Sequence, residues 1–254
     1  MSERIASSTE IDLSFLANVS LGNYQKAHIG KRILGLNFDI DTAAEETVWT
    51  QGGSYVFNTI AETLNITSSS ASETSAGTGA RTVFIEGLDT DYNMIEETVT
   101  LNGTSNVLTV NSYLRVNNMY VATSGSSQTN EGDITATSSG EAKLLSLVTA
   151  DCGTGLVGVY TVPNGYDGYM TSEFLSCTNV SDSQSNLVTY FFDENGNLGL
   201  GQRLSATSNG NNYVKNDFGL WVKVPSKTDI VLASNVTAND TEVGAGFEIV
   251  LIRD

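Results

Sequence analysis

"SSSASETSAGTGARTVFIEGLDTDYNMIEETVTLNG", residues 68–103, contains the pattern that decides the fold. After the glycine-rich loop at 77–81, residues 82–88 are rich in β-branched and aromatic side chains, and Val83 and Ile85 share one face at a period of two. That pattern predicts a strand. A phosphate-binding glycine loop must instead open a helix, whose N-terminus supplies free N–H groups. The stretch also lacks the Lys-Ser or Lys-Thr of a Walker motif, so it does not predict a nucleotide site.

The residues that follow continue the β pattern. Residues 89–93 (DTDYN) are typical of a connecting loop. In 96–101, acidic and hydroxyl side chains alternate with Val99 and Leu101, which predicts a second strand. The pair Asn102-Gly103 predicts a type I′ hairpin, because both central residues of that turn need a positive φ. The stretch therefore predicts strand, loop, strand, tight turn and strand.

The composition of the whole chain favours the same class of structure. Of its 254 residues, 40% are hydrophobic and only 16% are charged. The polar surface must therefore come from Ser, Thr, Asn and Gly, which suit exposed strand faces and turns better than helix surfaces. We expect an all-β protein, and the length allows one large β domain or two smaller ones.

Strand-like segments recur along the chain between turn residues, which is typical of a sandwich or jelly roll. We expect an all-β fold of one or more jelly-roll-like antiparallel β-sandwiches with an N-terminal arm. The arm is residues 1–35, the first β region 36–140, and the second, jelly-roll-like β region 141–254. Strands are expected in the first region near 61–67, 82–88, 94–101, 107–110, 113–123 and 133–137, and in the second near 144–149, 156–162, 169–177, 187–193, 198–204, 220–224, 229–233 and 247–252.

A second hairpin signal lies at Asn195-Gly196. The surrounding DENGN, residues 193–197, also has a faint likeness to a calcium loop. It lacks the full spacing and the distal bidentate glutamate of an EF-hand. A hairpin turn is therefore the better interpretation of this segment.

The charge of the chain excludes some partners. The formal net charge is −17, from 12 basic and 29 acidic residues, so phosphate backbones and anionic membrane surfaces should repel it. We expect no nucleic-acid partner. The N-terminus carries charges where a signal peptide needs an apolar core, and no apolar run reaches a membrane-spanning length. We therefore expect no membrane insertion.

Two cysteines and one histidine limit the available chemistry. Cys152 and Cys177 either pair or remain free thiols, and the sequence leaves both open. These three residues are too few for a four-ligand zinc site, and we expect no metal and no cofactor. His28 has no nucleophile-elbow motif to work with, so we expect no enzyme of the Ser-His or Cys-His type.

Carboxylates provide the remaining catalytic alternative. Asp39, Asp41, Glu45 and Glu46 could supply the acid pair of a glycosidase. An acidic chain offers many such pairs, so this signal has little specificity. We expect no catalytic residues, and a carboxylate-dependent depolymerase stays as an alternative.

A basic island near the N-terminus stands out from the acidic chain. Lys26, His28, Lys31 and Arg32 lie within the eight residues 25–32. Either this is a solvated stretch without a role, or it is a docking patch for an acidic neighbour, since complementary charges fix the register between partners.

The aromatic residues fit a buried role by their periodicity. A sugar-binding platform needs exposed aromatic rings, and the sequence does not show exposure. The aromatic residues in expected strands are Tyr190, Phe191, Phe192, Trp221 and Phe247.

Four stretches together resemble virion structural proteins of tailed bacteriophages, mainly marine ones. They are "DIDTAAEETVWTQGG" (39–53), "SSSASETSAGTGARTVFIEGLDTDYNMIEETVTLNGT" (68–104), "YLRVNNMYVATSGSSQTNEGDI" (113–134) and "VPSKTDIVLASNVTANDTEVGAGFEIVLI" (224–252). The long middle block is the most specific of the four. The resemblance implies a component of the virus particle, without catalytic residues to carry over and without fixing a place on the particle.

From this resemblance and the charge we expect a bacteriophage virion structural protein that acts by protein–protein binding. It would be an outer-head decoration or a tail-associated component, because an acidic protein is repelled by packaged DNA. A virion protein of this kind would be assembled in the cytoplasm of the host cell. Its partners would be other capsid or tail proteins and further copies of itself, since homo-oligomers favour closed symmetry. The alternative is a tail receptor-binding or glycan-binding module that binds host surface glycans.

Overall fold

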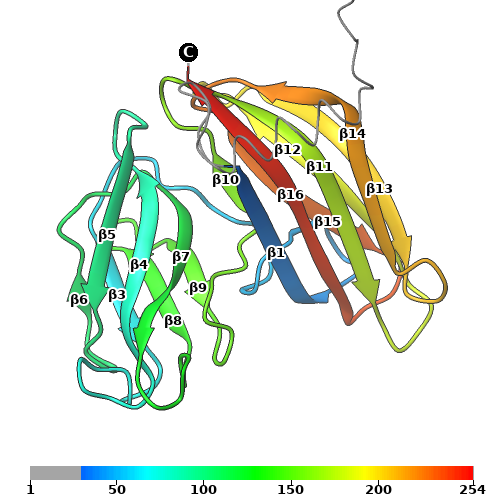
Figure 1. Ribbon diagram of the computed structural model, residues 1–254. Helices are drawn as coiled ribbons and strands as arrows, with labels where there is room; N and C mark the ends of the chain where they lie inside the picture. Colours follow the sequence, from blue (N-terminus) through cyan, green and yellow to red (C-terminus); the bar gives the residue numbers. More distant parts are fainter. Residues whose placement is uncertain (1–29, 254) are drawn as a thin grey trace, which may run out of the picture.

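The computed structural model describes residues 30–253, which form sixteen β-strands and no helix. The strands build two antiparallel β-sandwiches that lie side by side (Figure 1). The expected all-β, sandwich-type fold is therefore confirmed. The described residues include no helix long and apolar enough to cross a membrane.

The larger sandwich is a jelly roll of eight strands. Its two sheets have the orders β1-β16-β11-β14 and β10-β15-β12-β13. When these strands are counted one to eight along the chain, the orders read 1-8-3-6 and 2-7-4-5, the arrangement of two interlocked Greek keys. The strands are β1 (Lys31–Ile40), β10 (Val159–Thr161), β11 (Tyr166–Thr178), β12 (Gln184–Phe192), β13 (Leu198–Thr207), β14 (Tyr213–Val224), β15 (Asp229–Val236) and β16 (Thr241–Arg253).

The smaller sandwich is inserted between the first and second strands of the jelly roll. Its sheets have the orders β6-β3-β8-β9 and β5-β4-β7. Its strands are β3 (Leu64–Ser68), β4 (Ala80–Leu88), β5 (Met94–Thr100), β6 (Val107–Leu108), β7 (Arg115–Ser124), β8 (Ile134–Ser138) and β9 (Leu144–Val148). We call it the inserted sandwich. It contains the stretch 82–88 from which the β fold was predicted.

Strand pairing divides the chain differently from the expected boundaries at residues 35 and 140. Residues 31–37 pair with β16, so the end of the expected arm is the first strand of the jelly roll. Strand β9, expected to open the second region, pairs with β8 of the inserted sandwich. The first difference arises from pairing between strands distant in the sequence, which local periodicity does not report. The second arises because β9 continues from β8 as its neighbour, so the smaller sandwich ends after residue 148.

Close backbone packing marks the place where the two connections of the inserted sandwich meet β1. The short strand β2 (Glu46–Thr47) pairs with β15 beside this place. A Cβ atom on Gly35 would lie 2.1 Å from the carbonyl oxygen of Val48, and one on Gly158 would lie 2.3 Å from the same oxygen. Gly158 also has a φ of +64°. Only glycine fits at either position without a shift of the backbone.

Each sandwich encloses its own hydrophobic core. In β1 the side chains alternate between buried and outward positions, as expected for a strand with one face on a core. The fully buried Phe247 and Tyr160 are among the largest side chains of the jelly-roll core. Tyr113 and Met119 are among the largest buried side chains in the core of the inserted sandwich.

The hairpin predicted at Asn102-Gly103 is wrong. Strands β5 and β6 on either side of it do not pair with each other, because β5 pairs with β4 and β6 pairs with β3. Gly103 has a φ of +59°, but Asn102 is not among the residues with positive φ, so the turn is not type I′. The turn moves the chain from one sheet of the inserted sandwich to the other.

The hairpin predicted at Asn195-Gly196 is confirmed, since it joins the paired strands β12 and β13. Asp193 fixes the turn, because its carboxylate accepts hydrogen bonds from the main-chain N–H groups of Asn195 and Asn197. Gly196, at φ +77°, completes a type I turn with a bulge. These bonds lower the pKa of Asp193, the Asn197 side-chain bond most of all.

Both cysteines are free thiols in this structure. Cys177 is buried in the jelly-roll core, and Cys152 is half-buried in the connection that leaves the inserted sandwich. Of the two alternatives that the sequence left open, the structure shows unpaired thiols.

Candidate functional site

A buried ion pair joins the two sandwiches. Arg115 at the start of β7 donates from Nε to Asp229 Oδ1 and from Nη2 to Asp229 Oδ2, each over 2.8 Å. Asp229 is the first residue of β15 in the jelly roll, and the side chains of the pair are only 10% and 8% exposed. The parallel two-bond geometry is the strong, directional form of this interaction.

Neighbouring groups satisfy the remaining atoms of the pair. Arg115 Nη1 donates to the main-chain oxygens of Asn58 and Leu114, and Thr161 donates through its hydroxyl to Asp229 Oδ1 over 2.5 Å. The guanidinium also lies 4.5 Å from the ring centroid of Phe57. A buried charge pair needs such additional bonds to offset its desolvation.

A second set of contacts lies beside this pair. Asn117 of β7 exchanges two hydrogen bonds with the main chain of Thr161 on β10, each 2.9 Å long. Met94 of β5 packs against the core of the jelly roll. The N–H of Asn164 donates to the carbonyl oxygen of Tyr92. Polar and apolar contacts therefore fix how the two sandwiches sit against each other.

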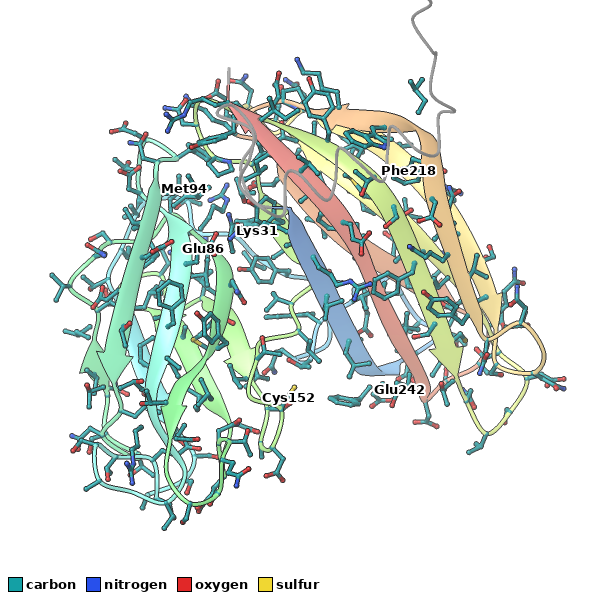
Figure 2. The ribbon with its side chains drawn as sticks, in the orientation of Figure 1. Lys31, Glu86, Met94, Cys152, Phe218 and Glu242 are labelled. Atoms are coloured by element: carbon teal, nitrogen blue, oxygen red, sulfur yellow. The ribbon has the colours of Figure 1, made fainter. Side chains whose placement is uncertain are left out.

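Lys31 and Glu86 face each other across the same junction (Figure 2). Lys31 Nζ on β1 lies 2.8 Å from Glu86 Oε2 on β4, and the glutamate side chain is only 9% exposed. The basic residue predicted to dock a neighbour therefore neutralises a nearly buried carboxylate of its own chain.

Of the other three residues in the predicted docking patch, the structure describes only Arg32. Arg32 is exposed and lies 3.2 Å from Glu248 of β16, with its guanidinium 5.9 Å from the Phe174 ring centroid. Lys26 and His28 lie outside the described residues. The structure thus places Lys31 and Arg32 on opposite faces of β1, and the docking role of the patch stays a prediction.

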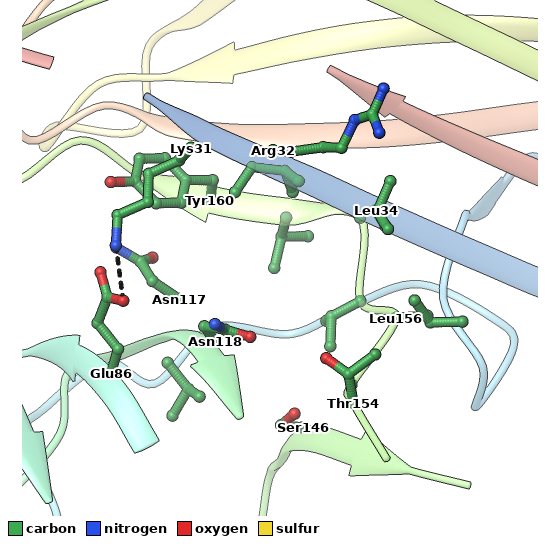
Figure 3. A pocket seen from close by; sticks show the side chains of 16 residues that line it. Lys31, Arg32, Leu34, Glu86, Asn117, Asn118, Ser146, Thr154, Leu156 and Tyr160 are labelled. Atoms are coloured by element: carbon green, nitrogen blue, oxygen red, sulfur yellow. Dashed lines mark hydrogen bonds and ion pairs between the residues drawn. The ribbon is translucent and has the colours of Figure 1, made fainter. Parts of the chain in front are cut away.

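A cleft of about 160 Å³ opens between the sandwiches next to Lys31 (Figure 3). Asn117 and Asn118 line it from β7, and Leu34 lines it from β1. The hydroxyls of Ser146 and Tyr160 also belong to its lining and are buried without a hydrogen-bond partner in residues 30–253. Burial raises the pKa of Tyr160. Buried polar groups of this kind are commonly bridged by water, and the cleft is large enough for several molecules.

An open groove of about 310 Å³ lies on the outer face of the jelly-roll sheet that contains β12. Tyr190 and Phe192 of β12 form one wall, with ring centroids 6.1 Å apart. Tyr55 and Phe57, from the connection to the inserted sandwich, line it as well, and their rings meet edge to face with centroids 4.9 Å apart. Also in the lining are Glu45, Glu46, Thr47, Ser54, Val231 and Ala233. We call this the aromatic groove.

Two carboxylates lie in the aromatic groove. Glu45 accepts a hydrogen bond of 2.7 Å from the Tyr190 hydroxyl, which raises the pKa of that tyrosine. Glu46 Oε2 accepts bonds from the Asn37 side chain and the Gly53 N–H. No lysine or arginine forms an ion pair with either carboxylate within residues 30–253.

The other two acids considered for catalysis do not line this groove. Asp39, near the end of β1, and Asp41 gather with Asp240 at the protein surface, where their carboxylate oxygens lie within 4.8 Å of one another. Desolvation and then the charges of Asp41 and Asp240 raise the pKa of Asp39. The four acids proposed from the sequence thus separate into an exposed cluster and the acids of the aromatic groove.

Exposed apolar side chains mark the edge of the jelly roll that is formed by β13 and β14. Leu198 and Leu200 on β13 are 57% and 61% exposed, and Leu220 on β14 is 90% exposed. Each strand pairs on one side only among the described strands, β13 with β12 and β14 with β11. We use the name leucine edge for these three residues and the two strand edges that bear them, which belong to different sheets of the sandwich. Unpaired strand edges with apolar side chains are association surfaces.

Sequence patterns did not single out Arg115 and Asp229. Each is a charged residue inside an apolar strand segment, in "YLRV" and "KTDIVL". Because charged residues are rarely fully buried unless paired, two such exceptions are a signal that could have suggested a buried pair. Which acid matches which base depends on the folded chain.

No family model matches the chain, and neither does any curated protein. Among solved structures, it is similar to the structure of infectious bursal disease virus Gt strain, with 12% identity, 94% of this chain and 78% of that chain covered, and a TM-score of 0.24. For the structure of the Gx strain the identity is 11%, the match covers 90% of this chain and 73% of that chain, and the TM-score is 0.25. For the crystal structure of the VP2 subviral particle of this virus the identity is 12%, the match covers 94% of this chain and 78% of that chain, and the TM-score is 0.24. At these TM-scores the likeness is loose.

Proposed function

We propose that this protein is a structural component of a bacteriophage particle and acts by binding other proteins. The observation that carries the proposal is the leucine edge, where Leu198, Leu200 and Leu220 are exposed on two strands that have free edges among the described residues. A jelly roll can be used for capsid assembly or for lectin-type binding, so the fold alone does not choose a function. An exposed apolar strand edge on a rigid body favours permanent association with protein.

The four sequence stretches that resemble phage virion proteins support the particle as the setting. The net charge of −17 favours the outer surface of the head, or the tail, over the DNA-filled interior. The junction between the sandwiches supports a rigid role, because buried directional contacts such as Arg115 to Asp229 hold the two bodies in one orientation. The protein would be a head decoration or a tail-associated component.

The test changes the leucine edge in the complete chain. We expect Leu200→Lys combined with Leu220→Lys to leave the fold intact, because both side chains are exposed, and to abolish oligomerisation and incorporation into particles. Val110→Lys is the matched control, since Val110 is 89% exposed on the inserted sandwich. If the double variant assembles as well as the control does, the leucine edge is not the association surface.

A further inference from the structure

The aromatic groove combines an apolar and an acidic lining. Val231 and Ala233 of β15 and four aromatic rings line it, together with the acids Glu45 and Glu46. The two acids are neighbours in the sequence and Glu45 is bonded to the Tyr190 hydroxyl, so we call the part around them the polar end. An elongated ligand with an apolar stem and one polar head fits this division better than a ligand that is polar all round.

The chemistry of the polar end selects the head group. An ionised carboxylate only accepts hydrogen bonds, and the Tyr190 hydroxyl already donates to Glu45. A second oxygen of Glu45 and one of Glu46 have no hydrogen-bond partner among the described residues. The end therefore calls for donors and for positive charge, and lysine and arginine are the charged side chains that only donate.

The aromatic walls favour a cation for an independent reason. Ring faces attract guanidinium and ammonium groups, arginine most often. The protein already uses this contact at the same cluster, where Arg115 lies 4.5 Å from the centroid of Phe57. The methylene stem of a basic side chain also gains by lying on apolar surface while its head reaches an acid.

We propose that the aromatic groove binds a basic side chain, arginine in preference to lysine, presented by a partner protein. The guanidinium would pair with Glu45 and stack on the rings of Tyr190 and Phe192, and its stem would lie over Val231 and Ala233. This inference rests on the proposed function and deepens it, because it gives the chemistry of the docking partner. The net charge of −17 would also steer a basic partner toward the protein.

The groove adjoins the leucine edge, which allows one partner segment to use both. Tyr190 pairs in register with Leu200, and Phe192 pairs with Leu198, so all four side chains lie on the same face of the sheet. A segment bound along β13 would therefore pass beside the groove and could place an arginine in it.

A sugar ring is the other kind of ligand that aromatic side chains commonly bind. Sugar hydroxyls both donate and accept, so a sugar site offers donors and acceptors around the ring. Here the charged groups of the lining are the acids Glu45 and Glu46, which only accept hydrogen bonds and so favour a ligand that only donates over a neutral sugar. The observations favour the basic side chain, and a neutral saccharide becomes an outcome of the test.

The test titrates the full-length chain with three capped tripeptides, Gly-Arg-Gly, Gly-Lys-Gly and Gly-Gln-Gly, and follows the methyl signals of Val231 and Ala233 by NMR. We expect the arginine peptide to bind with an affinity on the order of millimolar. The lysine peptide should bind more weakly, and the glutamine peptide at least about tenfold more weakly, because it lacks the charge. Binding of both basic peptides should weaken as salt is added.

Glu45→Gln is the decisive variant, because it keeps the size of the side chain and removes its charge. We expect this variant to bind the arginine peptide about tenfold or more weakly than the unmodified protein does. Asp182→Asn is the matched control: Asp182 is exposed and precedes β12 at the end away from Tyr190, so it loses the same charge far from the groove. The Asp182→Asn variant should bind the arginine peptide with the same affinity as the unmodified protein.

Several results would overturn the inference. They are equal binding of the glutamine and arginine peptides, an unchanged affinity in Glu45→Gln, and methyl shifts produced by a neutral disaccharide but by none of the peptides. Particle incorporation is measured separately with unmodified protein. Peptide binding without incorporation would defeat the proposed function alone, and incorporation without peptide binding would defeat the groove inference alone.

Discussion

Arg115 and Asp229 join the inserted sandwich to the jelly roll through two parallel hydrogen bonds of 2.8 Å each. They lie 114 positions apart in the sequence and meet because the inserted sandwich folds back on the jelly roll. The guanidinium and carboxylate planes must align for both bonds to form, so the pair fixes orientation as well as proximity.

Removal of the arginine should weaken the whole protein. We expect Arg115→Met to lower the free energy of unfolding by about 3–5 kcal/mol, because it leaves Asp229 buried without its partner. Urea denaturation measures the change. The double variant Arg115→Met with Asp229→Leu should recover part of the loss, since it no longer buries a single charge.

Arg32→Met is the control for that experiment. Its ion pair with Glu248 is exposed, with side-chain exposures of 61% and 37%, so its loss should change stability little. Equal effects of Arg115→Met and Arg32→Met would show that the junction does not stabilise the protein.

A buried glutamate should make the jelly roll sensitive to pH. Glu173 of β11 is fully buried opposite Phe247, and within the described part of the chain only one of its carboxyl oxygens has a partner, the hydroxyl of Thr189. Burial raises its pKa from 4.5 to about 7, although the Thr189 bond acts in the opposite direction. The folded protein therefore holds the proton more tightly than the unfolded chain does.

The sign of the pH effect follows from that proton. The protonated Glu173 stabilises the folded state fully below pH 4.5. This contribution to the free energy of unfolding is lost as the pH rises to about 7, and the loss is on the order of 3 kcal/mol. Glu173→Gln should remove this part of the pH dependence and be more stable than the unmodified protein at pH 8. Denaturation at several pH values measures it, with the exposed Glu242→Gln as the control (Figure 2). An unchanged pH profile in Glu173→Gln would contradict the assignment.

Two glycines with similar backbone angles should respond differently to alanine. Gly165, at φ +76°, has open space where a Cβ atom would lie, so Gly165→Ala should cost only about 1–2 kcal/mol, the penalty of the left-handed conformation. At Gly158 the Cβ would meet the Val48 oxygen at 2.3 Å, which adds roughly 1–3 kcal/mol of overpacking. Thermal denaturation compares them, and equal losses would show that the crossing at β1 is not tightly packed.

The first strand of the jelly roll gives a prediction about truncation. Because β1 begins at Lys31, deletion of residues 1–29 should leave the melting temperature unchanged. Deletion of residues 1–35 should lower it clearly, since it removes five residues that pair with β16 and the Lys31–Glu86 bond. Thermal melts measure both deletions, and the shorter one is the suitable form for testing the docking patch. A large loss of stability from the shorter deletion would mean that residues 1–29 support the fold.

Much of the fold could be predicted from local sequence. Alternation of apolar side chains located strands such as β4 and β5 to within two residues, since one face of each strand packs on a core. The turn at Asn195-Gly196 was predicted for the same local reason. The jelly-roll class followed from many short strands and few charges.

The remaining features depend on contacts between distant residues. That Lys31 begins a strand of the C-terminal sheet depends on residues 245–249, and no local pattern reports this pairing. Asn102-Gly103 has the composition of a hairpin turn, but the strands on either side of it join different sheets. The aromatic groove needs Tyr55 and Tyr190, which lie 135 positions apart. Tyr190 and Phe192 were predicted to be core residues from their periodicity, and the structure leaves both half-exposed.

The central claim is the proposed place of this chain in a phage particle, and electron cryomicroscopy of purified particles of the phage proposed to encode it tests that claim most directly. We expect repeated density for the paired sandwiches on the outer surface of the head or on the tail, arranged with the symmetry of the particle and contacting neighbours through the leucine edge. Particles that lack the protein, with the chain found only as a free monomer in infected cells, would contradict the claim.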